Sequence, residues 1–480
     1  MSLRTWFATP RVRRGLSASI VVLAAGGLVL LRTPADARSV PLGQEIGGPR
    51  LPVGPNAVQF SGPAAHGTLA LSHTRLLAGG ERRLFAELRM VADKSEEARE
   101  RAPLSMVVVL DTSGSMQGEK IQQAKDSVIQ LIRDMRDDDE IALVRYSSDS
   151  ELLQPLARVG SVRSLLIDKV QSINAGGGTN IAPALSHGMR AIDEVGKGRV
   201  RRVVLVSDGL DATRAQSEGV SRTAANRGVT VSTMGIGLDF DEAYMSSVAQ
   251  AGHGNFAFVK DAQALASFLT RELKEGASTT VEAATARIKL PRGTRLVRSI
   301  GAEATASDGE MTVRMGSLFA GDERRVIVEL ATNLELGDVS AFEGTVSWDR
   351  VGAGSAEAKI DRLEIAATSD PNEVESSRDG AVFASATSAL ASVRQLEATQ
   401  AYAGGDGRRA EQLIQQNMAD LRAAAAAAPA EERAVLERQE QAYAATSSAF
   451  AAAPPKSDEG KAKAKAAAAQ DSSNLGRKGF

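Results

Sequence analysis

Two kinds of segment alternate between residues 104 and 275, and this alternation limits the possible folds more than any other feature of the sequence. Short runs of Val, Leu, Ile and Met have the composition of strands buried on both faces. Between them lie longer segments whose apolar residues recur at helical spacing. Strand and helix in alternation predict a doubly wound α/β domain with a mostly parallel sheet. The expected strands cover 106–110, 141–146, 203–206, 229–234 and 256–259.

Strand-like patterns flank this α/β region on both sides. Residues 67–91 alternate apolar and polar side chains. From about 277 to 368 the apolar residues no longer recur at helical spacing, and the segments are typical of antiparallel strands. The later segments predict a small β-sandwich. Because the earlier strands have no sheet of their own, we expect them to pair with the sandwich. The α/β domain would then be an insertion in the β-sandwich.

The N-terminus indicates export. A basic stretch precedes an uncharged, mostly apolar run at 15–31, and Ala35-Asp36-Ala37 then offers a small-x-small pattern that a signal peptidase could cut. Arginines before the run and few after it predict an N-terminus inside the cytoplasm and the remainder outside, in the periplasm or at the cell surface. A cleaved signal peptide and an uncleaved membrane anchor both remain open. The basic residues are Arg4, Arg11, Arg13 and Arg14.

Composition shifts along the chain predict its remaining boundaries. Five prolines among glycines between 32 and 60 indicate an extended linker, and an Ala-rich region at 379–450 indicates packed helices. Lys, Ala, Asp, Ser and Gly dominate the end of the chain, which predicts a disordered tail. The expected segments are a signal peptide or anchor at 1–37, a linker at 38–65, a β segment at 66–100, the α/β domain at 101–276, the β-sandwich at 277–370, a helical hairpin region at 379–450 and a disordered tail at 451–480.

Composition also excludes several classes of site. The chain has no cysteine, so it forms no disulfide, thiolate nucleophile or Cys-ligated zinc site. Its four histidines include no pair at the short spacing that zinc sites use. A formal net charge of −2 gives no general attraction to nucleic acid, and we expect no nucleic-acid partner.

Three polar loops follow expected strands of the α/β domain, at the sheet edge where doubly wound folds place their ligand sites. Together they could bring two carboxylates and three hydroxyls around one cation. Such hard oxygen donors suit Mg²⁺ or Mn²⁺, with Ca²⁺ as a further possibility. The loops are Asp111-Thr112-Ser113-Gly114-Ser115, Gly176-Gly177-Gly178-Thr179-Asn180 and Ser207-Asp208-Gly209.

This combination resembles the von Willebrand factor type A (vWA) family, whose pattern is Asp-x-Ser-x-Ser, a Thr in a glycine loop, and Asp-Gly after a strand. All five positions match, at Asp111, Ser113, Ser115, Thr179 and Asp208. The resemblance covers about 104–275 and implies a metal-ion-dependent adhesion site, or MIDAS. In it Ser113 and Ser115 bind the metal directly, Thr179 binds directly or through water, and Asp111 and Asp208 act largely through waters. An acidic residue of a partner protein would then take the sixth position.

Other functions fit the sequence less well than this metal-dependent protein-binding module. A haloacid-dehalogenase-type phosphotransferase needs a second Asp where Ser113 stands, and a serine hydrolase elbow needs Gly-x-Ser-x-Gly, which neither Ser113 nor Ser115 fits. The glycine loop lacks the lysine of a P-loop. A metal-dependent hydrolase would need a positioned base, and none is evident, so we expect no enzyme. The remaining alternative is an envelope scaffold that acts through its β-sandwich and its helices at 381–401 and 408–425. The identity of the ligand and the oligomeric state stay open.

Overall fold

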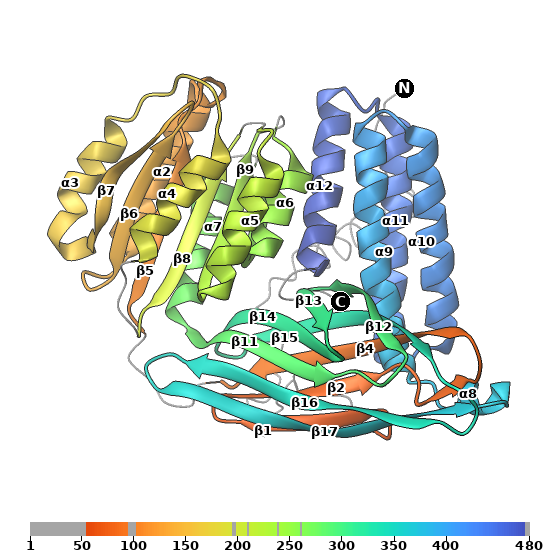
Figure 1. Cartoon of the computed structure of the whole chain (residues 1–480). Coiled ribbons are helices and arrows are strands. Elements are labelled where there is room, and N and C mark those ends of the chain that lie inside the picture. Colours follow the sequence, from red (N-terminus) through yellow and green to blue (C-terminus); the bar gives the residue numbers. More distant parts are fainter. Residues whose placement is uncertain are drawn as a thin grey trace, which may run out of the picture. The chain divides into compact units, whose positions relative to one another are not determined.

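The computed structural model describes residues 54–94, 102–193, 198–208, 211–237, 240–259 and 262–475 (Figure 1). The expected signal peptide or anchor at 1–37, and most of the expected linker, lie outside these residues. In the part of the chain that the structure describes, no helix is both long and apolar enough to cross a membrane.

A six-stranded sheet forms the centre of the α/β domain, with strands in the order β10-β9-β8-β5-β6-β7. Five of its strands run parallel, and their sequences are almost continuously apolar because both faces of the sheet are covered. The doubly wound, mostly parallel sheet expected from the sequence is therefore confirmed. The strands are β5 (Leu104–Asp111), β6 (Glu140–Tyr146), β7 (Ser150–Arg158), β8 (Val200–Ser207), β9 (Val229–Ile236) and β10 (His253–Val259).

Strand β7 was not anticipated. It pairs antiparallel with β6 at one edge of the sheet, and its side chains are mostly half-buried or exposed. Its sequence contains Pro155, which cannot donate a backbone hydrogen bond and is tolerated at an edge. A polar, proline-containing stretch lacks the apolar signature by which the inner strands were found.

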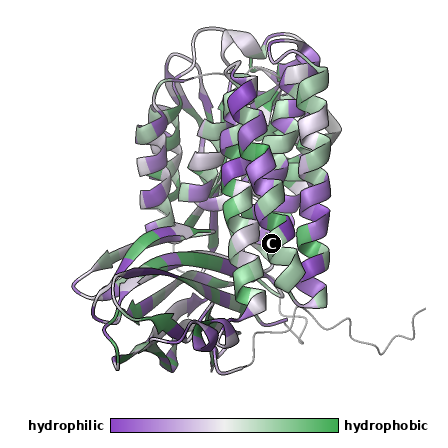
Figure 2. Cartoon of the chain, turned by 90° about the vertical axis from the view of Figure 1, so that its right-hand side faces the viewer, coloured by the Kyte–Doolittle hydropathy of each residue, from purple (hydrophilic) through white to green (hydrophobic). Residues whose placement is uncertain are grey.

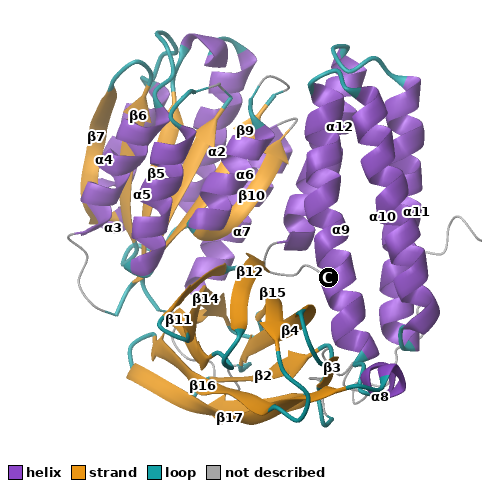
Figure 3. Ribbon diagram, turned by 45° about the vertical axis from the view of Figure 1, so that its right-hand side comes forward, coloured by secondary structure: helices purple, strands orange, loops and turns teal. Residues whose placement is uncertain are grey.

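Helices cover both faces of this sheet (Figure 3). One face packs against α2, α3 and α7, and the other against α4, α5 and α6. Each helix presents an apolar stripe to the sheet, as Ile121, Val128 and Ile132 do on α2. The helices are α2 (Glu119–Asp134), α3 (Val159–Gln171), α4 (Ile181–Asp193), α5 (Arg214–Asn226), α6 (Glu242–Ala251) and α7 (Ala262–Ala277).

A β-sandwich of two sheets frames the α/β domain. One sheet has the order β1-β2-β4-β15-β12 and the other β13-β14-β11-β16-β17-β3, and their inner faces share one core that includes Trp348. Green and purple residues alternate along these strands in Figure 2, as one buried face requires. The strands are β1 (Ala57–Gly62), β2 (Ala65–Leu71), β3 (Arg75–Leu77), β4 (Glu81–Ala92), β11 (Thr279–Lys289), β12 (Thr294–Ile300), β13 (Glu303–Ser307), β14 (Glu310–Phe319), β15 (Glu323–Asn333), β16 (Val339–Arg350) and β17 (Gly354–Thr368).

The pairing of β4 with β15 shows that the α/β domain is inserted in the sandwich. The two strands run antiparallel in continuous register from Glu81 opposite Asn333 to Val91 opposite Glu323. The chain leaves the sandwich after β4 and returns to it at β11, so the insertion expected from the sequence is confirmed. The expected linker at 38–65 extends too far, however. Residues 57–62 form β1, which pairs with β2, because Val58 and Phe60 supply the alternating apolar positions of a strand.

Five helices follow the sandwich. Helix α9 packs on β4 and β15 and also against α10, α11 and α12, so these Ala-rich helices pack against the rest of the chain. Gly405 lies between α9 and α10 and has φ 90°, a left-handed conformation that commonly ends a helix. Pro429 lies between α10 and α11 and directly precedes α11. The helices are α8 (Pro371–Ser376), α9 (Gly380–Ala403), α10 (Gly407–Ala427), α11 (Ala430–Ala452) and α12 (Asp458–Leu475).

The prediction of a disordered tail from 451 onward is wrong for residues 458–475, which form α12. Alanine is the best helix former, and its small side chain lets α12 approach α9 closely. Its two buried charged residues both have partners: Lys465 donates to the carbonyl of Phe240 at 2.8 Å and pairs with Glu242 at 2.9 Å, and Asp471 accepts from Tyr443. The low hydrophobicity of this segment therefore did not indicate disorder, because its buried charged side chains have partners in the folded protein.

Asp471 makes the packing of α12 depend on pH. The residue is 2% exposed, and burial raises its pKa from 3.8 to about 7, although hydrogen bonds from Tyr443, Ser392 and Asn474 oppose the shift. Between those two values the folded protein holds a proton that the unfolded chain has lost, so stability falls as pH rises through this range. The expected loss is at most about 4 kcal/mol.

Asp471→Asn should therefore flatten the dependence of stability on pH. Thermal denaturation between pH 4.5 and 7.5 should show a smaller fall in melting temperature for the variant than for the wild type. Asp458→Asn changes an exposed acid of the same helix and serves as the control. Equal slopes for Asp471→Asn and the wild type would contradict this account.

Candidate metal site

The three polar loops meet at one edge of the α/β sheet. Asp111 is the last residue of β5, and Asp208 directly follows β8, its neighbour in the sheet. Parallel neighbours end at the same edge, so the two carboxylates come close together. The glycine loop is held against the first loop by two backbone hydrogen bonds, from Gly114 to the carbonyl of Gly177 at 2.9 Å and from Gly176 to the carbonyl of Thr112 at 2.7 Å.

Asp111 anchors the first loop from a fully buried position. One carboxylate oxygen accepts the Ser113 amide at 2.8 Å, and the other accepts the Ser207 hydroxyl at 2.7 Å and the Tyr146 hydroxyl at 3.3 Å. Burial raises the pKa of Asp111, partly offset by the hydrogen bonds from Ser207 and Ser113, while the nearby Asp208 raises it further. Because its oxygens accept hydrogen bonds from Ser113, Ser207 and Tyr146, Asp111 fixes the shape of the loop.

Ser113, Ser115 and Asp208 form a continuous chain of oxygens beside this anchor. The two serine hydroxyls lie 3.0 Å apart, and Ser115 donates to Asp208 at 2.7 Å. Asp208 and Ser113 are buried, whereas Ser115 is exposed. The cluster is therefore open to solvent on the side of Ser115, where a ligand could approach.

Thr179 belongs to the same edge but is less closely tied to the cluster. It is half-buried and lies in the glycine loop just before α4. The expectation that this loop follows a strand is wrong, because the loop joins α3 to α4. Gly177 has φ 87°, which favours glycine, and the carbonyl of this residue is the one that meets Gly114. The structure thus joins Asp111, Ser113, Ser115 and Asp208 by side-chain contacts and brings in Thr179 through its loop.

Several supporting residues were missed from the sequence. Ser207 and Tyr146 end neighbouring strands and both donate to Asp111, while Lys120 contacts Asp208. Asp211 accepts the backbone amide of Ile181 at the start of α4, and Thr213 donates its amide and its hydroxyl to the same carboxylate. Asp211 therefore fixes the helix that follows Thr179. The spacing of Asp211 after Asp208 could have suggested a turn, but its partner lies in another loop.

The donors present suit a hard divalent cation. The hydroxyls of Ser113 and Ser115 lie 3.0 Å apart, and Ser115 donates to the carboxylate of Asp208 at 2.7 Å. The carboxylate of Asp111 accepts the backbone amide of Ser113. Oxygen donors of this kind are preferred by Mg²⁺ and Mn²⁺ and accepted by Ca²⁺. Among the described residues, no group of three or more His, Asp or Glu side chains is arranged to hold a metal.

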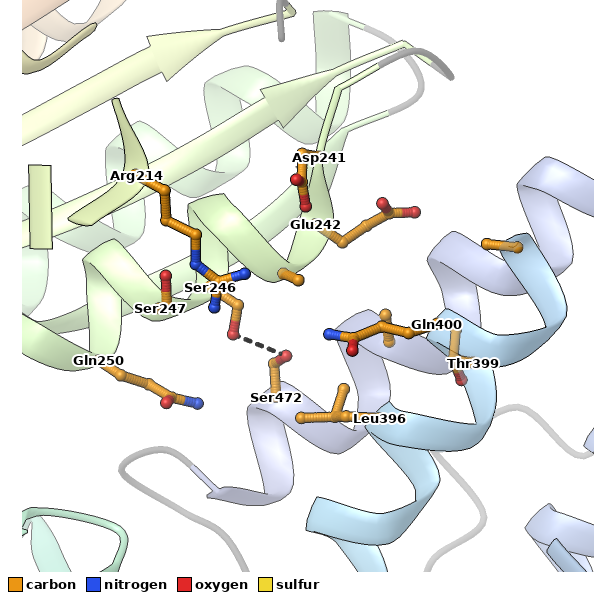
Figure 4. Close-up of a pocket in the computed structure, with 13 residues that line it drawn as sticks. Arg214, Asp241, Glu242, Ser246, Ser247, Gln250, Leu396, Thr399, Gln400 and Ser472 are labelled. Carbon is orange, nitrogen blue, oxygen red and sulfur yellow. Dashed lines mark hydrogen bonds between the residues drawn. The ribbon is translucent and has the colours of Figure 1, made fainter. Parts of the chain in front are cut away.

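A separate cavity of about 270 Å³ lies between α6 and the helices α9 and α12 (Figure 4). It contains none of the five candidate metal residues. A hydrogen bond of 2.9 Å between Ser246 and Ser472 crosses from one side to the other. The cavity shows that the α/β domain and the C-terminal helices pack incompletely where they meet. Its polar lining includes Arg214, Asp241, Glu242, Gln250, Thr399 and Gln400.

A doubly wound sheet with an Asp-x-Ser-x-Ser loop, a glycine-loop Thr and an Asp after the neighbouring strand defines the vWA class. Residues 105–271 match the von Willebrand factor type A domain family, and this region of the chain is a vWA domain. The family resemblance inferred from the sequence is thereby confirmed. Domains of this family commonly mediate protein interactions.

Relatives share this domain at modest identity. The chain is 27% identical over 266 residues to the uncharacterized protein YfbK of Escherichia coli, a stretch that covers 53% of this chain and 46% of that protein. It is 27% identical over 165 residues to the inter-alpha-trypsin inhibitor heavy chain H4 of Bos taurus, covering 32% of this chain and 18% of that one. The matched stretches are thus less than half the length of either relative.

Solved structures match more of the fold. A von Willebrand factor type A protein from Catenulispora acidiphila superposes with a TM-score of 0.64 at 18% identity, covering 82% of this chain and 89% of that one. The ArnB paralog VWA2 from Sulfolobus acidocaldarius gives a TM-score of 0.57 at 16% identity, covering 85% and 99%. At these identities the likeness concerns the fold alone, and it extends beyond the vWA domain.

Proposed function

We propose that this chain is an extracytoplasmic protein-binding module that uses a divalent cation, with Mg²⁺ as the preferred ion, to capture an acidic group of a partner protein. The observation that carries the proposal is the chain of oxygens from Ser113 through Ser115 to Asp208 at the open edge of the sheet. Hydroxyls and carboxylates at a solvent-facing edge suit a cation with one position left for an outside ligand.

Each candidate residue has a distinct task in this proposal. Ser113 and Ser115 hold the cation through neutral hydroxyls, and Thr179 adds a third hydroxyl directly or through water. Asp111 and Asp208 hold ordered water and balance the charge. A bound divalent cation supplies an electrophilic position for a partner's carboxylate. Because the hydroxyls carry no charge, they do not themselves weaken that attraction.

We also propose that the site binds a partner and does not catalyse a reaction. A hydrolase would need a base beside the cation. Tyr146 is a neutral hydroxyl whose pKa is raised by burial, so it serves as a hydrogen-bond donor to Asp111. The ring of His187 contacts the hydroxyl of Ser150 at 3.3 Å and so has a partner of its own. These observations favour a module that binds and does not turn over a substrate.

The extracytoplasmic location rests on the basic N-terminal stretch and the apolar run at 15–31. If the segment is not cleaved, it also attaches the chain to the membrane. Cell fractionation with N-terminal sequencing of the mature protein distinguishes the two cases. Recovery of the full-length protein in the cytosol would contradict export.

A pull-down from the envelope fraction tests the binding role. Immobilised wild-type protein in MgCl₂ should retain partners that EDTA releases, and Ser113→Ala with Ser115→Ala should retain none of these even in MgCl₂. Ser161→Ala, which changes an exposed serine on α3, is the matched control. Retention that ignores both EDTA and the double substitution would contradict metal-dependent capture.

That contrary result would favour the second candidate, an envelope scaffold. The observation behind it is the joint between the vWA domain and the C-terminal helices, where Lys465 and Ser472 of α12 contact α6 and the residue before its cap, Phe240. A scaffold of this kind would present its sandwich and helices to a partner without any cation. Partner retention by the Ser113→Ala, Ser115→Ala protein would then continue.

A further inference from the structure

The side chain of Lys120 lies inside the candidate metal site. Lys120 is the second residue of α2, close in sequence to the serines of the first loop, and its ammonium contacts one oxygen of Asp208. The side chain of Asp208 is fully buried, whereas that of Lys120 is 30% exposed. The contact is therefore an ion pair with one buried member and one member that reaches the solvent.

The two oxygens of Asp208 have different partners. Ser115 donates to Oδ1 at 2.7 Å, while the ammonium of Lys120 is held by Oδ2. A hydroxyl expected to bind the cation and a resident positive charge thus share one carboxylate. Any cation that enters between the serines and Asp208 meets that positive charge at close range.

The fold reserves space for the lysine. A Cβ atom at Gly237, beyond the end of β9, would lie 3.0 Å from Cε and 3.2 Å from Nζ of Lys120. Gly237 has φ 80°, a conformation in which glycine is favoured. The lysine stem therefore fits against a position without a side chain, which leaves room for its ammonium at the site.

We propose that Lys120 acts as a built-in monovalent competitor that lowers the affinity of the site for a divalent cation. The inference rests on the proposed function, because it supposes that the site binds such a cation. Lys120 neutralises Asp208, so the metal-free protein does not bury an uncompensated charge. In return, its ammonium repels an incoming cation and occupies an oxygen that could otherwise support a metal-bound water.

Two effects of opposite sign follow for a variant without this charge. Lys120→Met leaves Asp208 buried and unpaired in metal-free buffer, so the variant should melt at a lower temperature than the wild type. Mg²⁺ should then bind about tenfold more tightly, since one opposing charge is gone. A purely structural lysine would produce the first effect without the second.

Isothermal titration with MgCl₂, supported by melting curves with and without MgCl₂, measures both effects. Lys120→Met and Lys120→Gln remove the charge, and Lys120→Arg keeps it. Lys289→Met removes a lysine from the exposed ion pair with Glu343 on the sandwich and is the control. We expect tighter binding in the two neutral variants, and values within about threefold of the wild type for Lys120→Arg and Lys289→Met.

The outcomes separate this inference from the proposed function. Binding by the wild type with equal or weaker binding by Lys120→Gln and Lys120→Met would overturn the inference and leave the metal site intact. Absence of Mg²⁺ binding in the wild type and in every variant would overturn both. Binding in the neutral variants alone would support the competitor role and contradict the proposed Mg²⁺-dependent function of the wild-type protein.

Discussion

Asp111→Ala should lose all Mg²⁺-dependent stabilisation and should also unfold more easily in metal-free buffer. The substitution removes the acceptor for the Ser113 amide and for the hydroxyls of Ser207 and Tyr146, all within a buried site. Losing an acceptor for a buried donor costs about 1–3 kcal/mol, so a loss of about 3 kcal/mol is expected for these hydrogen bonds together. Urea denaturation of the wild type and the variant, with and without MgCl₂, measures both losses.

Asp111→Asn provides the matched variant for this experiment. Its amide oxygen can still accept the Ser113 amide, so part of the stability should return, while the charge that favours a cation is absent. A Mg²⁺-dependent rise in stability in either variant, equal to that of the wild type, would show that Asp111 does not support a metal. Wild-type stability in metal-free Asp111→Ala would contradict its role as an anchor of the loop.

The second large effect is expected at the ion pair between Arg202 on β8 and Glu272 on α7. Their side chains are 1% and 0% exposed and lie 2.7 Å apart. Glu272 also accepts hydrogen bonds from Ser232 at 2.8 Å and Asn255 at 2.6 Å. Glu272→Gln removes the nearer of two carboxylates beside Arg202, the other being Glu275 at 3.8 Å. Breaking one side of a buried pair costs about 3 kcal/mol.

Chemical denaturation compares Glu272→Gln with Glu343→Gln. Glu343 belongs to an exposed pair with Lys289, and such pairs contribute at most about 1 kcal/mol. The expected result is a large loss of stability for the first variant and almost none for the second. Similar losses for both would mean that the burial of the Arg202 pair does not set its contribution.

The α/β fold was predictable because its inner strands and helices carry strong local patterns. Buried parallel strands are apolar throughout, and each helix repeats its apolar stripe. The insertion in the sandwich was also predictable, since strands such as β4 need a partner sheet. Strand β7 escaped notice because an edge strand with Pro155 has neither pattern.

Helix α12 was missed for a different reason. Its sequence resembles that of a disordered tail, and its stability comes from partners far away in the chain, such as Phe240 for Lys465 and Tyr443 for Asp471. Tertiary contacts of this kind leave no local signal. Composition alone therefore misjudges a helix whose charges are satisfied inside the fold.

Only part of the candidate site was likewise predictable from the sequence. Four of its five main residues lie at or after the ends of β5 and β8, and Thr179 lies in the glycine loop between α3 and α4. The residue pattern of the three loops allowed all five to be named from the sequence. The residues that hold them could not be named in this way. Ser207 and Tyr146 matter because they end strands beside Asp111, and Lys120 matters because it reaches Asp208 across the sheet edge.

Isothermal titration of the wild-type protein with MgCl₂ tests the central claim most directly, with the Ser113→Ala, Ser115→Ala protein as the comparison. The account predicts saturable binding of one Mg²⁺ per chain in the wild type, and none in the double variant while its melting temperature in EDTA stays close to that of the wild type. Equal binding by both proteins, or no binding by either while both are folded, would contradict it.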